Sequence, residues 1–121
     1  MKKLIFIFIL ISFNVFAIEK DTTFNKEVFM EAQKAGKTVV INSWNKTCIT
    51  CAEQIKILQE AEKKFNDVLF LSYAQKNKDI AKYLNIDYRS TIVVYKDNKE
   101  IARAVGITKK EEIYSLIKKG I

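Results

Sequence analysis

Two residue types are missing from this 121-residue chain and a third is scarce. There is no histidine and no proline, and cysteine occurs only at Cys48 and Cys51. Without histidine the chain cannot supply a Cys-His or Ser-His catalytic pair, or a Cys₂His₂ zinc site. Two cysteines by themselves cannot close a Cys₄ zinc site either. The sequence therefore excludes these classes of site within the chain, and we expect neither a resident metal nor another cofactor.

The composition is that of one globular domain. Hydrophobic residues make up 49% of the chain and charged residues 29%, as is usual for soluble proteins, and 121 residues suffice for a single core. The net charge of +7 reflects an excess of lysine, which we interpret as a solvated surface with a weak attraction for anionic lipid head groups. Arginines are few, and no basic helix carries interleaved aromatic residues, so we expect no binding to nucleic acid.

Residues 1–17 have the pattern of a secretory signal peptide. Lys2 and Lys3 precede an apolar run over residues 4–13, and residues 15–17 offer a cleavage site with small residues at its −3 and −1 positions. The run is shorter than the ~20 residues that a membrane-spanning helix needs, and no cysteine follows it to carry a lipid anchor. We therefore expect export to the oxidising periplasm, with an uncleaved N-terminal anchor as the alternative.

The remainder, residues 18–121, is predicted to form one α/β domain. Apolar residues at helical spacing alternate with short β-rich runs, in the order α-β-α-β-α-β-β-α. Two β-α crossovers followed by a hairpin at Asp97-Asn98 imply a central mixed four-stranded sheet flanked by helices on both faces. The expected elements are a helix from a Thr22 or Thr23 cap to about residue 35, a strand at 38–43, a helix at 48–65, a strand at 68–73, a helix from Asn77 or Asp79 to Asn85, strands at 91–95 and 100–105, and a last helix capped by Thr108.

The chain is organised around the motif Cys48-x-x-Cys51. The motif follows the apolar strand at 38–43 and Trp44, and it opens an amphipathic helix, which is the context in which a redox dithiol works. Backbone N–H groups and the dipole at a helix N-terminus favour an anion, so Cys48 should ionise more readily than a free thiol, whose pKa is about 8.5. Lys46 adds a nearby positive charge of the favourable sign. We expect Cys48 to attack and Cys51 to resolve.

This stretch resembles the active-site region of the thioredoxin superfamily, in which a strand and a tryptophan-containing loop lead into Cys-x-x-Cys. The resemblance covers roughly residues 24–120 and implies the thioredoxin fold in a short form, without the extra N-terminal strand. The approach to the first strand is most similar to periplasmic thioredoxin-like domains, including the C-terminal domain of the disulfide reductase of bacterial inner membranes. Further similar segments are Gly36-Lys37, Ala81 to Thr91, Tyr95 to Asn98 and Val105-Gly106.

The resemblance also implies roles for the residues around the dithiol. Trp44 matches the tryptophan that packs beside the active site. Thr47 stands where the family often has a second tryptophan, which implies a smaller and more polar binding surface. The two residues between the cysteines tune the reduction potential in this superfamily. Ile49 and Thr50 are neither charged nor histidine, which favours a reductant or a neutral exchanger over a strong oxidant.

Two positions depart from the family pattern. Asn42 occupies the place of a buried carboxylate that helps to deprotonate the resolving cysteine. Asparagine is not a base, so resolution by Cys51 should be slower, or should use water or another carboxylate. Ser90 stands in the place of the family's cis-proline, and a cis bond before a non-proline residue costs about 3–4 kcal/mol. We therefore predict a trans Arg89–Ser90 bond and an altered loop.

The same loop is the expected substrate-binding segment. By resemblance, the backbone at Arg89, Ser90 and Thr91 pairs with a substrate peptide, and Thr91 matches the threonine that commonly follows the cis-proline. Two interpretations of Ser90 are open, because its hydroxyl could bond a sulfur of the dithiol or simply be tolerated in a loop. Arg89 could help to bind an acidic partner or could simply be exposed.

Three hypotheses follow for the function. The first is an exported thiol–disulfide oxidoreductase, monomeric, that acts on protein dithiols and disulfides and meets a transient redox partner in the membrane. The second is a handler of Cu(I) or a similar soft metal, because two thiolates suit such ions. The third is a thioredoxin-fold interaction module whose cysteines stay locked as a disulfide, although a bridge that closes so short a loop constrains little of the unfolded chain.

Overall fold

The computed structural model describes residues 22–121, so the predicted signal peptide at residues 1–17 lies outside the described residues. None of the helices within residues 22–121 is long and apolar enough to cross a membrane. The elements follow the predicted order, and their bounds are α1 (Lys26–Lys34), β1 (Thr38–Trp44), α2 (Ile49–Lys64), β2 (Val68–Ala74), α3 (Lys78–Leu84), β3 (Thr91–Lys96), β4 (Lys99–Val105) and α4 (Lys110–Lys118).

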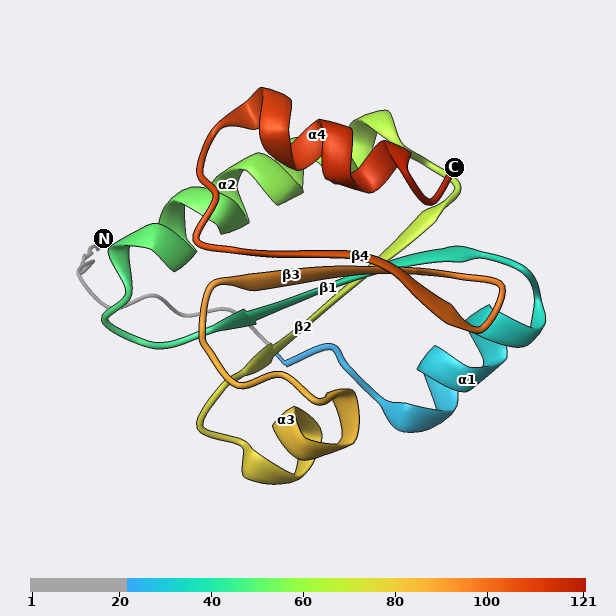
Figure 1. Cartoon of the computed structure of the whole chain (residues 1–121), viewed down its shortest axis with the longest axis horizontal. Helices are drawn as coiled ribbons and strands as arrows, with labels where there is room; N and C mark the ends of the chain where they lie inside the picture. The colour runs from blue at the N-terminus through green and yellow to red at the C-terminus, as the bar shows by residue number, and fades with distance from the viewer. Residues whose placement is uncertain (1–21) are drawn as a thin grey trace, which may run out of the picture.

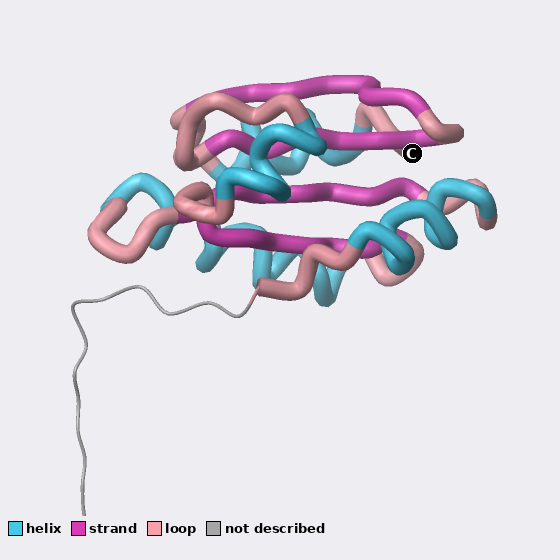
Figure 2. The backbone as a smooth tube through the Cα atoms, turned by 90° about the horizontal axis from the view of Figure 1, so that it is seen from below, coloured by secondary structure: helices cyan, strands magenta, loops and turns pink. Residues whose placement is uncertain are grey.

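The strands form one mixed sheet in the order β2-β1-β3-β4. Strand β1 pairs parallel with β2 and antiparallel with β3, and β3 continues through a tight turn into antiparallel β4. Helices α2 and α4 cover one face of the sheet, and α1 and α3 cover the other (Figure 1). Figure 2 shows the strands side by side between the helices. The predicted four-stranded mixed sheet with helices on both faces is confirmed.

Strand β1 is buried along its whole length, because helices cover it on both sides. Val39 and Ile41 face the core under α1 and α3, together with Phe29 and Tyr73. Val40, between them, faces the opposite core under α2 and α4. A strand that is buried on both faces needs apolar residues at successive positions, rather than alternate ones, which is why the run from residue 38 predicts this strand well.

The ends of α3 and the turn between β3 and β4 are formed by the residues that the sequence predicts. Asn77 caps α3 by accepting the N–H of Ile80, and Asn85 ends that helix in the left-handed conformation with φ 58°. Asp97 and Asn98 connect β3 and β4 with φ values of 52° and 67°. Two consecutive left-handed residues match the right-handed twist of the hairpin, and asparagine and aspartate tolerate this conformation best after glycine.

The predicted caps of the first and last helices are wrong. Helix α1 is capped by Asn25, whose Oδ1 accepts the N–H groups of Glu27 and Val28. Thr23 serves another purpose, because it binds the lead-in segment to β2: its backbone N–H donates to the Ser72 carbonyl and its Oγ1 accepts the Ser72 N–H, both at 2.9 Å.

Helix α4 begins one residue later than predicted. Lys109, rather than Thr108, occupies the N-cap position, and it provides no side-chain cap. Ile113 and Ile117 are fully buried against the sheet, so packing, rather than a local cap, sets where this helix sits.

We predict that Asn25→Ala destabilises the domain by about 1 kcal/mol, because two N–H groups at the start of α1 lose their acceptor. The measurement is urea unfolding followed by circular dichroism. Thr22→Ala is the matched control, since Thr22 is exposed and should change the free energy of unfolding by less than about 0.5 kcal/mol. Equal effects of the two variants would contradict the cap assignment.

Candidate active site

Cys48 and Cys51 lie between the end of β1 and the first turn of α2, where they form a disulfide with their Cα atoms 5.2 Å apart. Cys48 is the N-cap residue of α2, and its Sγ accepts a hydrogen bond from the backbone N–H of Cys51 at 3.1 Å. The structure therefore places the pair at the helix N-terminus, as the sequence predicts. In the reduced protein, the same N–H group and the helix dipole would favour a thiolate at Cys48.

The disulfide is packed against Trp44 and Ile55 in a small buried cluster. Cys51 is fully buried, whereas Cys48 is 3% exposed, so Cys48 is the more accessible residue of the pair. Trp44 is the last residue of β1, and its indole N–H has no hydrogen-bond partner among the described residues. The structure thus brings Trp44 to the dithiol, where the resemblance expects it.

Asn42 lies on β1 two residues before Trp44 and is 3% exposed. Its side-chain Nδ2 has no hydrogen-bond partner within residues 22–121. It lines a cavity of about 50 Å³, together with Ser72 and the α2 residues Gln59 and Glu62. A cavity of this size with polar walls can hold water.

Glu62 is the acidic residue of that cavity, and it is the obvious candidate for the alternative carboxylate. It follows Cys51 by eleven positions along α2, which corresponds to ~16 Å along the helix axis. That separation is too long for direct proton transfer from the Cys51 thiol. The structure therefore provides no direct replacement for a carboxylate at Asn42 from this helix.

Among the described residues, the side chains whose pKa values are shifted lie in other parts of the fold. Burial raises the pKa of Tyr95 to about 12 and raises the pKa of Tyr73 further. The hydrogen bond and ion pair with Glu100, at 2.8 Å, raise the pKa of Arg103. Both tyrosines lie in the core under α1 and α3, whereas the dithiol packs in its own cluster. None of these groups supplies a base for Cys51.

In the loop before β3, the Arg89–Ser90 bond is trans, as predicted. Ser90 has φ 57°, and a left-handed conformation costs a residue with a side chain about 1–3 kcal/mol. Its backbone is fully bonded: the N–H donates to Ser43 O at 2.9 Å, and the carbonyl accepts from Gly106 N at 2.9 Å and from Gln54 Nε2 at 3.0 Å. No hydrogen bond joins the Ser90 hydroxyl to either sulfur among the described residues.

Ser43 and Thr91 hold the two ends of this loop together. The hydroxyls of Ser43 and Thr91 both donate to the Tyr88 carbonyl, at 2.9 and 2.6 Å, and Thr91 N donates to Ser43 Oγ at 3.3 Å. The backbone of the predicted substrate-binding segment is thus fixed to the end of β1 beside Trp44. Ser43 is absent from the residues predicted from the sequence, although its place beside Trp44 could have indicated it.

Exposed side chains surround the fixed backbone. Ile49 is 78% exposed and Tyr88 is 67% exposed. Lys46, Thr47 and Arg89 are also exposed, whereas Thr50 is half-buried. Tyr88 is absent from the sequence-predicted residues; an aromatic residue directly before Arg89 in a loop is the signal that could have found it. The exposed side chains at this end of the domain are therefore both apolar and basic.

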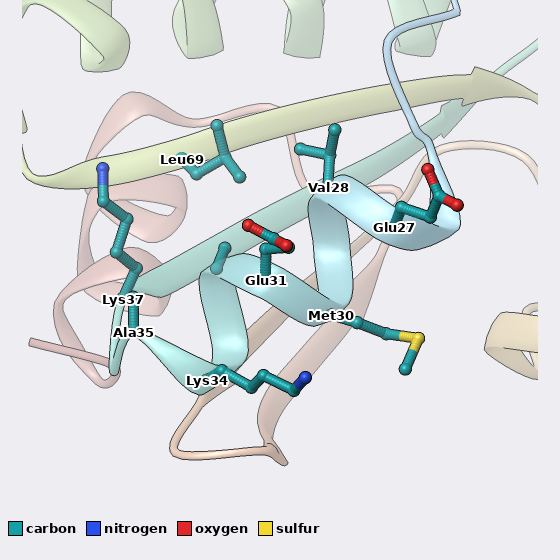
Figure 3. A pocket seen from close by; sticks show the side chains of 9 residues that line it. Glu27, Val28, Met30, Glu31, Lys34, Ala35, Lys37 and Leu69 are labelled. Atoms are coloured by element: carbon teal, nitrogen blue, oxygen red, sulfur yellow. The ribbon is translucent and has the colours of Figure 1, made fainter.

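A wide hollow lies elsewhere, on the surface of α1. It has a volume of about 770 Å³ and is lined by α1 and by Leu69 of β2. Figure 3 shows Val28 and Leu69 at its apolar side and the charged side chains of Glu31 and Lys37 around it. It contains no cysteine. Within residues 22–121, no group of three or more histidine, cysteine, aspartate or glutamate side chains is arranged to hold a metal ion.

A cysteine pair at the start of a helix that follows the central strand of a mixed sheet is the arrangement of a thiol–disulfide oxidoreductase. The comparisons agree with this class. The thioredoxin family model matches residues 15–119. The chain belongs to the thioredoxin family, and the predicted membership is confirmed.

Individual relatives show how far the similarity extends. The chloroplastic F-type thioredoxin of Pisum sativum is 34% identical over 93 residues, which is 74% of this chain but only 51% of the pea protein. The thioredoxin of Mycoplasma genitalium is 32% identical over 71% of this chain and 85% of its own length. Among solved structures, Trxlp from Edwardsiella tarda superposes with a TM-score of 0.74 at 18% identity, over 78% of this chain and 95% of that one. This last similarity concerns the fold.

We predict that Asn42→Asp speeds the release of a mixed disulfide by Cys51, because it adds a base where Asn42 now offers an amide. The same change should cost stability, because burial raises the pKa of the introduced carboxyl above its unfolded value of about 3.9. Relative to the parent, stability is kept below pH ~4 and is lost as the pH rises through the raised pKa, by about 1–3 kcal/mol.

Urea unfolding at pH 4 and pH 8 measures the pH-dependent stability, and stopped-flow mixing with oxidised glutathione measures release. Asn66→Asp is the control, because Asn66 is exposed and its replacement should leave both quantities unchanged. A variant at Asn42 that is equally stable at both pH values would show that this site is solvated.

Proposed function

We propose that this protein is an exported thiol–disulfide oxidoreductase that reduces or exchanges disulfides in exported proteins. The observation that carries the proposal is the geometry of the pair. Cys48 caps α2, its sulfur accepts a backbone N–H, and Cys51 lies within disulfide distance one turn further along the same helix. This arrangement allows a reversible change between dithiol and disulfide without moving the helix.

The reaction follows from the order of access to the two sulfurs. The Cys48 thiolate attacks one sulfur of a substrate disulfide, a mixed disulfide forms, and the other substrate sulfur leaves as a thiolate that takes up a proton. Cys51 then loses its proton and attacks the Cys48 sulfur, which releases the second substrate thiol. Two electrons pass to the substrate, and the protein is left with the Cys48–Cys51 disulfide. A protein dithiol must then reduce it again.

The two residues between the cysteines support a direction for electron flow. Neither Ile49 nor Thr50 carries a charge or an imidazole, so neither adds strong stabilisation to a Cys48 thiolate. A dithiol form that is weakly stabilised favours the donation of electrons over their removal from substrates. We therefore propose a reductant or an isomerase-type exchanger.

The proposed compartment and partners depend on the N-terminal sequence and the surface. The signal-peptide pattern at residues 1–17 supports export to the periplasm. There, an oxidising environment makes a reducing partner necessary, and a membrane redox protein that meets the domain transiently would meet that need. Arg89 and the loop surface at Ser90 and Thr91 are proposed to receive the substrate, although the N–H and carbonyl of Ser90 and the N–H of Thr91 are already bonded within the fold. The domain is proposed to act as a monomer.

A second candidate is an interaction module whose disulfide stays closed. The observation in its favour is burial, because Cys51 is fully buried and Cys48 is only 3% exposed. Such a bridge would resist mild reductants, whereas a catalytic pair would exchange with them. The two candidates therefore differ in the chemistry of the disulfide and not in its place in the fold.

We predict that Cys51→Ser traps substrate proteins as mixed disulfides, because Cys48 can still attack but release is blocked. The adducts should appear on non-reducing gels of a periplasmic extract and should disappear with dithiothreitol. Cys48→Ser is the matched control, and it should trap at least about tenfold less, because the buried Cys51 cannot reach a partner. A Cys51→Ser variant whose Cys48 is alkylated normally, but which traps nothing, would contradict the mechanism.

We predict a midpoint potential for Cys48–Cys51 near or below about −230 mV, in the range of dithiol donors. The measurement is the equilibration of the domain with glutathione buffers, followed by quantification of free thiols. A value near about −120 mV would instead make the protein an oxidant and would overturn the interpretation of Ile49 and Thr50. Failure of any buffer to open the bond would support the locked module.

We predict that the full chain, expressed in a Gram-negative bacterium, appears in the periplasmic fraction with Ile18 as its first residue. Ile7→Asp should block export, because it places a charge in the apolar run of residues 4–13. Lys20→Glu, which lies beyond the cleavage site, is the control and should be exported normally. N-terminal sequencing identifies the first residue, and cell fractionation identifies the compartment. A full-length chain in the membrane fraction would support the uncleaved anchor instead.

A further inference from the structure

Gln54 is a polar residue on the otherwise apolar buried side of α2. It is fully buried, and it lies among Cys51, Ile55, Leu58 and Ala61. Its side-chain Oε1 has no hydrogen-bond partner among the residues that the structure describes. A buried amide with an unpaired oxygen is less favourable than an apolar side chain of the same size. Packing of the helix therefore does not explain this glutamine.

The hydrogen bonds of the Gln54 amide nitrogen explain why a glutamine occupies this position. Nε2 donates to the Ser90 carbonyl at 3.0 Å and to the Ile107 carbonyl at 2.9 Å. Ser90 directly precedes β3 and Ile107 follows β4, so these partners are 36 and 53 positions away from Gln54 in the sequence. A single side chain thus connects the helix that carries the dithiol to two loops.

Those two loops are also bonded to each other. Gly106 N donates to the same Ser90 carbonyl at 2.9 Å, and the Ser90 N–H donates to Ser43 O at 2.9 Å. The left-handed conformation of Ser90 is therefore held by hydrogen bonds from β1, α2 and the loop after β4. A proline ring locks φ at about −65° and could not adopt the φ of 57° at Ser90, so in this chain, which has no proline, hydrogen bonds fix a different conformation of the loop.

The position of Gln54 on the helix couples this loop to the dithiol. Gln54 follows Cys51 by three residues, so the two lie on the same side of α2. Long side chains on a helix extend back over the preceding turn, which here contains Cys51. The same turn of α2 therefore fixes both the resolving cysteine and the backbone of the Ser90 loop.

We propose that Gln54 is a positioning residue, which holds the Ser90 loop at the dithiol and so sets the affinity for polypeptide substrates. This inference rests on the proposed function, because it assumes that a polypeptide docks on that loop. Among the described residues, the Gln54 side chain makes its hydrogen bonds to Ser90 O and Ile107 O and not to either sulfur. Its loss should weaken substrate docking and leave the thiol chemistry intact.

The test compares Gln54→Met with Gln75→Met. Methionine keeps the length of the side chain but cannot donate a hydrogen bond. Gln75 is the control, because its side-chain amide also makes two hydrogen bonds, but to partners nearer in the sequence: it donates to Ile86 O at 3.0 Å and accepts from the Tyr73 hydroxyl at 2.7 Å. Both variants and the parent are assayed with dithiothreitol as electron donor on the disulfides of insulin. They are also assayed on 5,5′-dithiobis(2-nitrobenzoate), a small disulfide without a peptide backbone.

Gln54→Met should raise KM for insulin roughly tenfold, since two hydrogen bonds that fix the docking loop are lost, with kcat changed by less than about twofold. Reaction with the small disulfide should be unchanged, and Gln75→Met should behave as the parent in both assays. An unchanged KM for insulin in Gln54→Met, or an equal rise in Gln75→Met, would overturn the proposal.

Amide hydrogen exchange gives a second readout that needs no activity. Exchange at the Ser90 and Gly106 N–H groups should be faster in Gln54→Met and unchanged in Gln75→Met. Unchanged exchange in Gln54→Met would overturn the positioning role whatever the kinetics show. A parent protein that fails to reduce insulin, while Gln54→Met still accelerates exchange at these amides, would count against the proposed function and would support the positioning role of Gln54.

Discussion

Strand β1 is buried between two layers of helices, and both the core and the dithiol depend on that burial. All seven of its residues are buried, with Val40 facing one core and Val39 and Ile41 the other. The strand ends at Trp44, and α2 begins five residues later. Because the strand is fixed on both faces and paired on both edges, the short loop after it presents Cys48 at one defined place above the sheet.

The surroundings of the disulfide are unusual for a protein core, because polar atoms there remain unpaired. Within residues 22–121, the buried polar side-chain atoms without a hydrogen bond are Asn42 Nδ2, Trp44 Nε1 and Gln54 Oε1. Asn42 and Trp44 lie on the strand that leads to Cys48, and Gln54 lies one turn beyond Cys51. A buried polar atom without a partner lowers stability, so apolar packing alone does not explain these three side chains.

The loop at Ser90 adopts a backbone conformation that proline could not adopt, because Ser90 has a φ of 57°. A proline ring fixes a backbone dihedral covalently. Here the backbone at Ser90 is fixed by three hydrogen bonds that come from Ser43, Gln54 and Gly106. The restriction by a proline ring is local, whereas these hydrogen bonds require β1, α2 and the segment after β4 to be packed together. Formation of the Ser90 loop is therefore tied to formation of the whole fold.

The sequence by itself determined the order of the elements, the mixed sheet and the place of the dithiol. The reasons are local: the apolar run of β1, the helical spacing in α2, and the tolerance of Asn85, Asp97 and Asn98 for left-handed backbone are visible in neighbouring residues. Only the tertiary structure decided that Asn25 rather than Thr23 caps α1, because Thr23 is bonded to Ser72, 49 positions away. It alone also decided the role of Gln54, since the carbonyls that its amide meets come from two distant loops. Contacts between segments far apart in the chain leave no periodic pattern near the residues that make them.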